Sequence, residues 1–140
     1  MSNGQKLSGS CLCGKVTFKA DGVSENYHAC HCKMCLRWGG SPFFGTHIGG
    51  VEFAGEENIV RYDSSEWAQR GFCGLCGSNL FYYLKPADSY SIPAGLFDDQ
   101  SALTLAREIF IDHKPAGYSF GGNLPSMTEA EVFAKYGAGS

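Results

Sequence analysis

The chain has 140 residues, a formal net charge of −3 and 44% hydrophobic residues, which suits a single globular domain over residues 1–140. No run of Lys or Arg stands out, and no apolar run approaches the roughly 20 residues that span a bilayer. This excludes nucleic acid and membrane as expected partners, and the polar N-terminus, which lacks a signal-peptide apolar region, predicts a cytoplasmic protein.

The predicted elements are mainly strands. Gly accounts for 19 residues, about twice the average frequency, which favours a turn-rich β protein over a helical bundle. Runs of β-branched and aromatic residues predict two strands within residues 5–20 and others at 27–29, 42–46, 51–53, 59–62, 67–72, 80–84, 90–94 and 108–111, the last being the final core strand.

Turn and cap signals complete this pattern. Asp21 and Gly22 predict a turn, and residues 36–40 predict a helical turn that ends at a glycine. Near the C-terminus, Thr128 and Glu131 form a capping-box pattern. A helix is therefore predicted over residues 129–136, ended by Gly137.

The most informative stretch contains Cys30, Cys32 and Cys35. In an extended chain, residues two apart point to the same side, and Cys-x-x-Cys spacing lets two thiolates reach one metal from a tight turn. The segment therefore supplies three ligands of one zinc ion and no obvious fourth. Three protein ligands leave a position for substrate, which is typical of a catalytic zinc site.

The remaining four cysteines form two pairs about sixty residues apart, Cys11 with Cys13 and Cys73 with Cys76. Disulfides are rare in a reducing cytosol, and seven cysteines would leave one unpaired. Each pair is incomplete alone, so together they predict a closed structural zinc site that cross-links the first hairpin to the middle of the domain. The alternative is that these cysteines are small buried hydrophobes.

Two alternatives stay open for Cys30, Cys32 and Cys35. A histidine, either His28 or His31, would complete a second structural zinc site; alternatively, the three thiols would join other cysteines in a redox-active cluster. If the fourth position is open, the metal would deprotonate a thiol that binds there. The resulting thiolate is a nucleophile toward a small carbonyl compound, and the reverse step breaks the carbon–sulfur bond.

Arg37 and Trp38 follow the three cysteines closely. As substrate contacts, Arg37 would pair with a carboxylate and Trp38 would wall the pocket; the alternative is a surface cation and a core aromatic. Arg70 is predicted to hold a structural loop. His47 and His113 are predicted to be ordinary surface or core histidines.

Residues 9–14, 30–37, 64–65 and 70–78 resemble the signature blocks of the glutathione-dependent formaldehyde-activating (GFA) family, which also includes centromere protein V. The resemblance covers about residues 5–115 and all seven cysteines, and leaves 116–140 as a C-terminal extension. It implies a mainly β fold, the Mss-type β-tent of short antiparallel strands with a C-terminal helix. It also implies two zinc ions, a structural one on Cys11, Cys13, Cys73 and Cys76 and a catalytic one on Cys30, Cys32 and Cys35.

The activity that the resemblance implies is that of a carbon–sulfur lyase. Its founding reaction adds glutathione to formaldehyde, giving S-hydroxymethylglutathione, so the expected partner is a small-molecule thiol such as glutathione. The competing hypothesis is a non-catalytic two-zinc structural or interaction module on the same scaffold.

Overall fold

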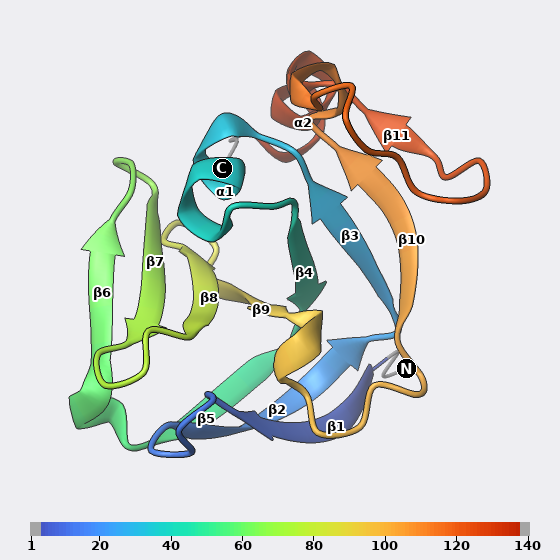
Figure 1. Ribbon diagram of the computed structural model, residues 1–140. Helices are drawn as coiled ribbons and strands as arrows, with labels where there is room; N and C mark the ends of the chain where they lie inside the picture. Colours follow the sequence, from blue (N-terminus) through green and yellow to red (C-terminus); the bar gives the residue numbers. More distant parts are fainter. Residues whose placement is uncertain (1–3, 138–140) are drawn as a thin grey trace.

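The computed structural model describes residues 4–137, and their strands form two sheets (Figure 1). The smaller sheet is antiparallel and contains β1 (Gly4–Ser10), β2 (Thr17–Ser24) and β5 (Gly50–Ala54). The larger sheet contains β3 (Asn26–Cys30), β4 (Phe43–His47), β6 (Ile59–Asp63), β7 (Ala68–Cys73), β8 (Asn79–Leu84), β9 (Ser89–Pro93), β10 (Thr104–Ile109) and β11 (Ser126–Met127). Its strand order is β11-β10-β3-β4-β9-β8-β7-β6.

The predicted mainly β fold, with antiparallel sheets and a C-terminal helix, is confirmed. Two pairings in the described chain, β3 with β10 and β10 with β11, are parallel. These two pairs join segments that are distant in sequence, which parallel strands require because a short hairpin cannot connect them.

Two local predictions were wrong. The turn at Asp21 and Gly22 does not form, because β2 continues to Ser24 and Asp21 still pairs with Gly50 of β5. Gly22 has a φ of 58°, so the chain bends there without leaving the sheet. The bounds of the strand predicted over residues 108–111 are also wrong, since β10 ends at Ile109 and Ile111 begins a 3-10 turn; the two-residue β11 that follows has no buried residue.

The helices are short, and the two α-helices have side-chain N-caps. They are α1 (Lys33–Gly39), α2 (Glu129–Tyr136) and the 3-10 turns η1 (Glu56–Asn58), η2 (Ala94–Leu96) and η3 (Ile111–His113). The predicted capping box of α2 is present, with Thr128 and Glu131 each bonded to the other's backbone N–H. Gly40 and Gly137 end α1 and α2 in the left-handed conformation. None of the helices within residues 4–137 is long and apolar enough to cross a membrane.

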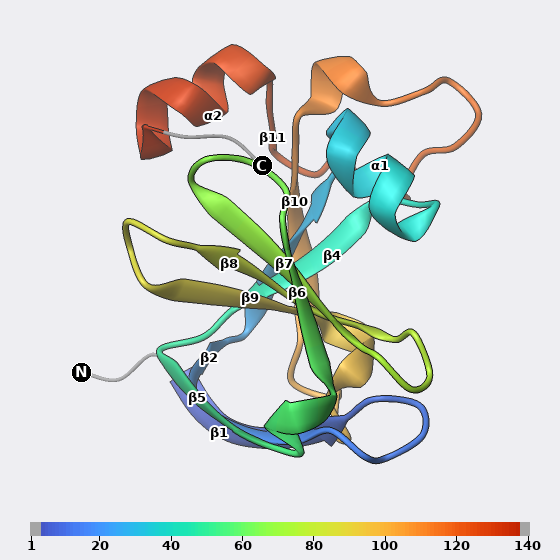
Figure 2. The same cartoon turned by 90° about the vertical axis from the view of Figure 1, so that its left-hand side faces the viewer.

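Two separate clusters of buried side chains hold these elements together. The larger cluster includes Phe18, Phe81, Ile92 and Phe97 and fills the space between the two sheets. The alternate exposed and buried residues of β2 supply part of it, as expected for a strand with one solvated face. The smaller cluster combines Cys30, Cys32 and Cys35 with Phe110 and Val132. It lies where α1, η3 and α2 gather at one end of the molecule (Figure 2).

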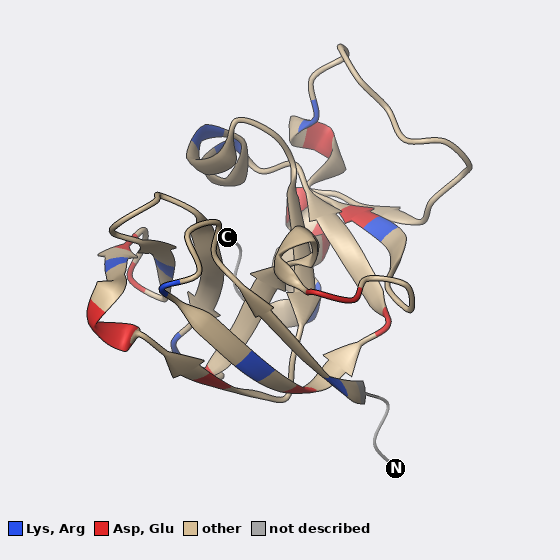
Figure 3. Ribbon diagram, turned by 60° about the horizontal axis from the view of Figure 1, so that its bottom comes forward, with Lys and Arg blue, Asp and Glu red and all other residues tan. Residues whose placement is uncertain are grey.

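Charged residues are dispersed over the strands and turns. In Figure 3, Lys and Arg segments alternate with Asp and Glu segments along the smaller sheet and its surroundings. Several pair directly, such as Lys85 with Asp63 at 2.9 Å and Lys6 with Asp21 at 3.9 Å. Exposed pairs of this kind contribute little to stability.

Candidate metal centres and the adjoining cavity

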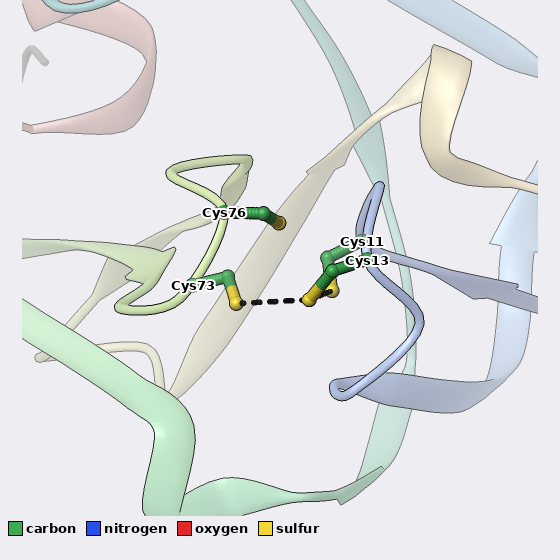
Figure 4. A group of neighbouring side chains, drawn as sticks. All are labelled: Cys11, Cys13, Cys73 and Cys76. Carbon is green, nitrogen blue, oxygen red and sulfur yellow. Dashed lines mark hydrogen bonds between the residues drawn. The ribbon is translucent and has the colours of Figure 1, made fainter.

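The two distant cysteine pairs meet in one cluster (Figure 4). Cys11 directly follows β1 and Cys13 lies in the β1–β2 loop, whereas Cys73 ends β7 and Cys76 lies in the β7–β8 turn. The four sulfur atoms all lie within 4.8 Å of one another. The cluster therefore joins the smaller sheet to the larger one, as the sequence predicted for a cross-link.

The spacing of these sulfurs fits zinc and not a disulfide. The Sγ atoms of Cys11 and Cys13 are 3.5 Å apart, and those of Cys13 and Cys73 are 3.9 Å apart. A disulfide requires about 2.05 Å, whereas a tetrahedron with zinc–sulfur bonds of about 2.3 Å places its sulfurs about 3.8 Å apart. None of the seven cysteines forms a disulfide within residues 4–137.

Ser78 prepares this cluster for a cation. Its hydroxyl accepts from the backbone N–H of Leu12 at 3.0 Å and lies 3.3 Å from the sulfur of Cys76. Hydrogen bonds from Ser78 lower the pKa of the Cys76 thiol to about 5, which favours the thiolate that zinc binds. Gly77, with a φ of 79°, makes the tight turn that sets Cys76 beside Cys73.

The other three cysteines form a second cluster at the β3–α1 junction. Cys30 ends β3, Cys32 is the N-cap of α1 and Cys35 lies in the first turn of α1. All three side chains are at least 97% buried, and their sulfurs lie within 4.8 Å of one another. Cys32 also acts as a cap, because its sulfur accepts from the backbone N–H of Cys35 at 3.2 Å.

The electrostatics of this second cluster also suit a cation. Contacts with the Cys32 and Cys35 side chains, together with burial, raise the pKa of the Cys30 thiol well above its ordinary value. Three thiolates cannot lie so close together without a positive charge among them. Both clusters therefore fit zinc, whose bound ion would hold the thiols as thiolates.

Neither local histidine joins the three sulfurs. His31 is fully buried and faces away: its ring Nδ1 lies 2.7 Å from the Tyr118 hydroxyl and its Nε2 lies 2.8 Å from a Glu108 oxygen. His28 lines a cavity beside Cys30, but its ring lies outside the sulfur cluster. Within residues 4–137, the cluster thus contains three sulfurs and no further His, Asp or Glu ligand atom.

Arg70 was not expected here. It is 3% exposed and its Nη1 donates to the sulfur of Cys35 at 3.5 Å. Its guanidinium lies 5.0 Å from the ring centre of Trp38 and 5.2 Å from that of Tyr82, while Nε and Nη2 have no hydrogen-bond partner among residues 4–137. A buried cation thus lies directly against the three-cysteine cluster.

A cavity of about 120 Å³ opens beside the same cluster. Cys30 and Cys35 form part of its wall, and much of the rest is apolar, from Phe43, Leu84, Ile109, Phe110 and Val132. Val132 and Tyr136 belong to α2, so the predicted C-terminal extension contributes to the site. Burial raises the pKa of the Tyr82 hydroxyl, which also lines the cavity, so that group remains protonated at neutral pH.

The two predicted substrate contacts occupy different surroundings. Arg37 is exposed and lies on the last turn of α1. Trp38 is partly buried, packs against Phe43 and lines a second hollow with Cys35. The first cavity is also lined by His28, which the sequence offered only as a possible zinc ligand, and by His47 and Arg107, which it did not assign to the site. They come from three neighbouring strands, and no local spacing links them.

A third group of possible ligands contains Asp112, His113 and Glu129. The His113 ring lies 3.1 Å from a Glu129 carboxylate oxygen, and an Asp112 oxygen accepts from the Glu129 backbone N–H at 2.9 Å. These contacts join η3 to α2 and cap that helix.

Comparison with known proteins gives consistent results. The sequence model described as glutathione-dependent formaldehyde-activating enzyme matches residues 6–113. An uncharacterized lyase of Schizosaccharomyces pombe is 34% identical over 129 residues, which cover 91% of this chain and 94% of the relative. A crystal structure of a Rhodobacter sphaeroides protein has a TM-score of 0.54 at 18% identity, covering 86% of this chain and 99% of the other. That last likeness concerns the fold alone.

Proposed function

Because the chain belongs to the glutathione-dependent formaldehyde-activating enzyme family, we propose that it is a zinc-dependent carbon–sulfur lyase acting on a small thiol adduct. The observation that carries this proposal is that the sulfurs of Cys30, Cys32 and Cys35 form a cluster beside a cavity, to which no His, Asp or Glu of the described residues adds a ligand atom. The glutathione adduct of formaldehyde is the first substrate to test, since the family's description names both compounds.

Two zinc ions have different roles in this proposal. Cys11, Cys13, Cys73 and Cys76 would hold one ion with four sulfurs, so that ion would link the two sheets and take no substrate. Cys30, Cys32 and Cys35 would hold the other ion, to which a substrate sulfur could add. When bound there, zinc lowers the pKa of an incoming thiol and so supplies a thiolate at neutral pH.

The reaction forms one carbon–sulfur bond. The substrate sulfur attacks the carbonyl carbon of the aldehyde, and the carbonyl oxygen takes up a proton in place of the one that the thiol loses, so the product is a hydroxyalkyl thioether. The lyase direction reverses each step. Among the chain's own groups, the protonated hydroxyl of Tyr82 lines the cavity and can donate a hydrogen bond to the developing alkoxide.

The test is Cys32→Ser, a substitution that removes the thiolate but keeps the cap. Serine is a preferred N-cap residue, so α1 should persist with a hydroxyl in place of the sulfur. The variant should keep its fold, bind one zinc instead of two, and lose formation of S-hydroxymethylglutathione from glutathione and formaldehyde. The control Cys73→Ser removes a ligand from the other cluster and should destabilise the fold itself.

A spectroscopic measurement separates the enzyme from a non-catalytic zinc module. With cobalt in the three-cysteine cluster, glutathione should strengthen the sulfur-to-metal absorption bands, because it adds a thiolate ligand. An unchanged spectrum, or a Cys32→Ser variant that unfolds or loses both metals, would contradict the assigned roles.

A further inference from the structure

The cavity beside the three cysteines has a cationic end. Arg107, His28 and His47 line it together with the apolar walls, and Cys30 and Cys35 lie in the same lining. Arg107 of β10 is in register with His28 of β3, and the rings of His28 and His47 are 5.6 Å apart. One guanidinium and two imidazoles from neighbouring strands thus meet on one face of the larger sheet, and the positive charge at this end comes from Arg107.

This arrangement depends on Gly45, which lies opposite His28 on β4. A Cβ atom added there would be 3.1 Å from Nε2 of His28 and 2.9 Å from the ring of Phe43. Such contacts are too tight for both rings to keep their places. The glycine therefore provides the space in which the imidazole of His28 faces the cavity.

The positive charge at this end has no acidic partner in the described structure. The residues of the 4–137 range that line the cavity include no Asp or Glu, and Arg107 takes part in none of the ion pairs found among them. Its neighbour Glu108 points to the other face of the sheet, where it binds His31. Arg107 is partly buried, and a carboxylate that pairs with it would offset part of the cost of removing its charge from water.

The separation of Cys30 and His28 along β3 sets the distance between the substrate sulfur and the anionic group that Arg107 would bind. Cys30 and His28 are two residues apart on β3, which corresponds to about 7 Å along a strand. A ligand whose sulfur lies at the three-cysteine cluster would reach the basic end with a group only a few carbon atoms away. Arginine binds carboxylates in a bidentate manner through its planar fork.

We propose that Arg107, flanked by His28 and His47, is a carboxylate-binding subsite, and that the cavity selects short thiols, and their aldehyde adducts, that carry a carboxylate a few carbon atoms from the sulfur. This inference rests on the proposed function, because it assumes that the substrate sulfur binds at Cys30, Cys32 and Cys35. It adds the substrate class and the residue that recognises it.

The test compares 3-mercaptopropionate with its methyl ester, which has the same thiol and chain but no charge. Each compound is titrated into cobalt-substituted protein, and the sulfur-to-metal bands report binding. The acid should bind about tenfold more tightly than the ester in the wild-type protein. Arg107→Gln should weaken binding of the acid and bring the two affinities to within about twofold, whereas Arg107→Lys should retain part of the preference.

The outcomes are distinguishable. Equal binding of acid and ester in the wild-type protein overturns the subsite and leaves the proposed function intact; this comparison requires no variant to fold. A full preference for the acid in Arg107→Gln overturns the role of Arg107. A cobalt spectrum that responds to neither compound overturns both the subsite and the proposed function.

Discussion

Replacing Arg70 with Met should weaken zinc binding at the three-cysteine cluster and should stabilise the form of the protein that has no zinc there. With zinc bound, three thiolates and one dication leave a net charge of −1 beside the Arg70 guanidinium, which lies 3.5 Å from the Cys35 sulfur. Because that charge is shared among three sulfurs that lie within 4.8 Å of one another, an effective separation of about 6 Å is used in Coulomb's law. At an effective dielectric constant of about 20, the attraction is about 3 kcal/mol, or roughly a hundredfold in zinc affinity.

Without zinc at Cys30, Cys32 and Cys35, the same guanidinium lowers the free energy of unfolding. It is 3% exposed, and its Nε and Nη2 have no hydrogen-bond partner in the described part of the chain. The neutral thiols beside it do not offset the cost of burying a charge. Methionine fills a similar volume without a charge, so Arg70→Met should raise the free energy of unfolding of this form by about 1 kcal/mol or more.

Two measurements test this reasoning. Competition with a chelator gives zinc affinity at the three-cysteine cluster while the four-cysteine cluster stays filled, and urea unfolding of the form with one zinc gives stability. Arg61→Met is the control. Arg61 is exposed, and its guanidinium lies 4.7 Å from the ring centre of Phe81. Phe81 belongs to the larger core cluster and not to the cluster that contains the three cysteines. Unchanged zinc affinity in Arg70→Met, or a loss of stability in both forms, would refute the argument.

Two further predictions concern the scaffold. Gly71→Ala should lower the free energy of unfolding by about 1–3 kcal/mol, because the new Cβ would lie 2.2 Å from the buried ring of Phe81. The control is Gly50→Ala, because nothing lies within 4 Å of a Cβ added there. It should be nearly neutral in the same urea titration. Hydrogen bonds from Lys85, and secondarily from Gln69, lower the pKa of Asp63 below 3.8. Because the pKa of Asp63 is lower in the folded state than in the unfolded state, this carboxylate stabilises the fold at pH values above its unfolded-state pKa. That stabilisation is lost as the pH falls through the folded-state pKa. Lys85→Met should therefore raise the Asp63 pKa in a carboxyl NMR titration, and no change would show that Lys85 does not set it.

Several features of the site could be predicted because they depend on local spacing. Cys30 and Cys32 alternate at the end of a strand, and Cys35 follows one helical turn after the cap, so neighbouring backbone geometry alone brings their sulfurs together. The capping box at Thr128 and Glu131 is local in the same way. The grouping of Cys11 and Cys13 with Cys73 and Cys76 could also be inferred, because each pair is incomplete as a zinc site.

Features that depend on strand register could not be predicted in this way. A strand's own residues determine which side chains share a face, but not which strand lies beside it or at what offset. His28 faces Arg107 only because β3 pairs in parallel with β10. His31 finds its hydrogen-bond partners 77 and 87 residues later in the chain.

The amino-acid sequence by itself thus determined the β-rich class, the capped C-terminal helix and the two sets of cysteines, because residues a few positions apart generate each of these patterns. Only the tertiary structure decided that Arg70 lies against Cys35, that Arg107 and two histidines form one end of a cavity, and that α2 walls that cavity. These contacts join segments that are far apart in sequence. Their geometry comes from sheet register and core packing, which no local pattern encodes.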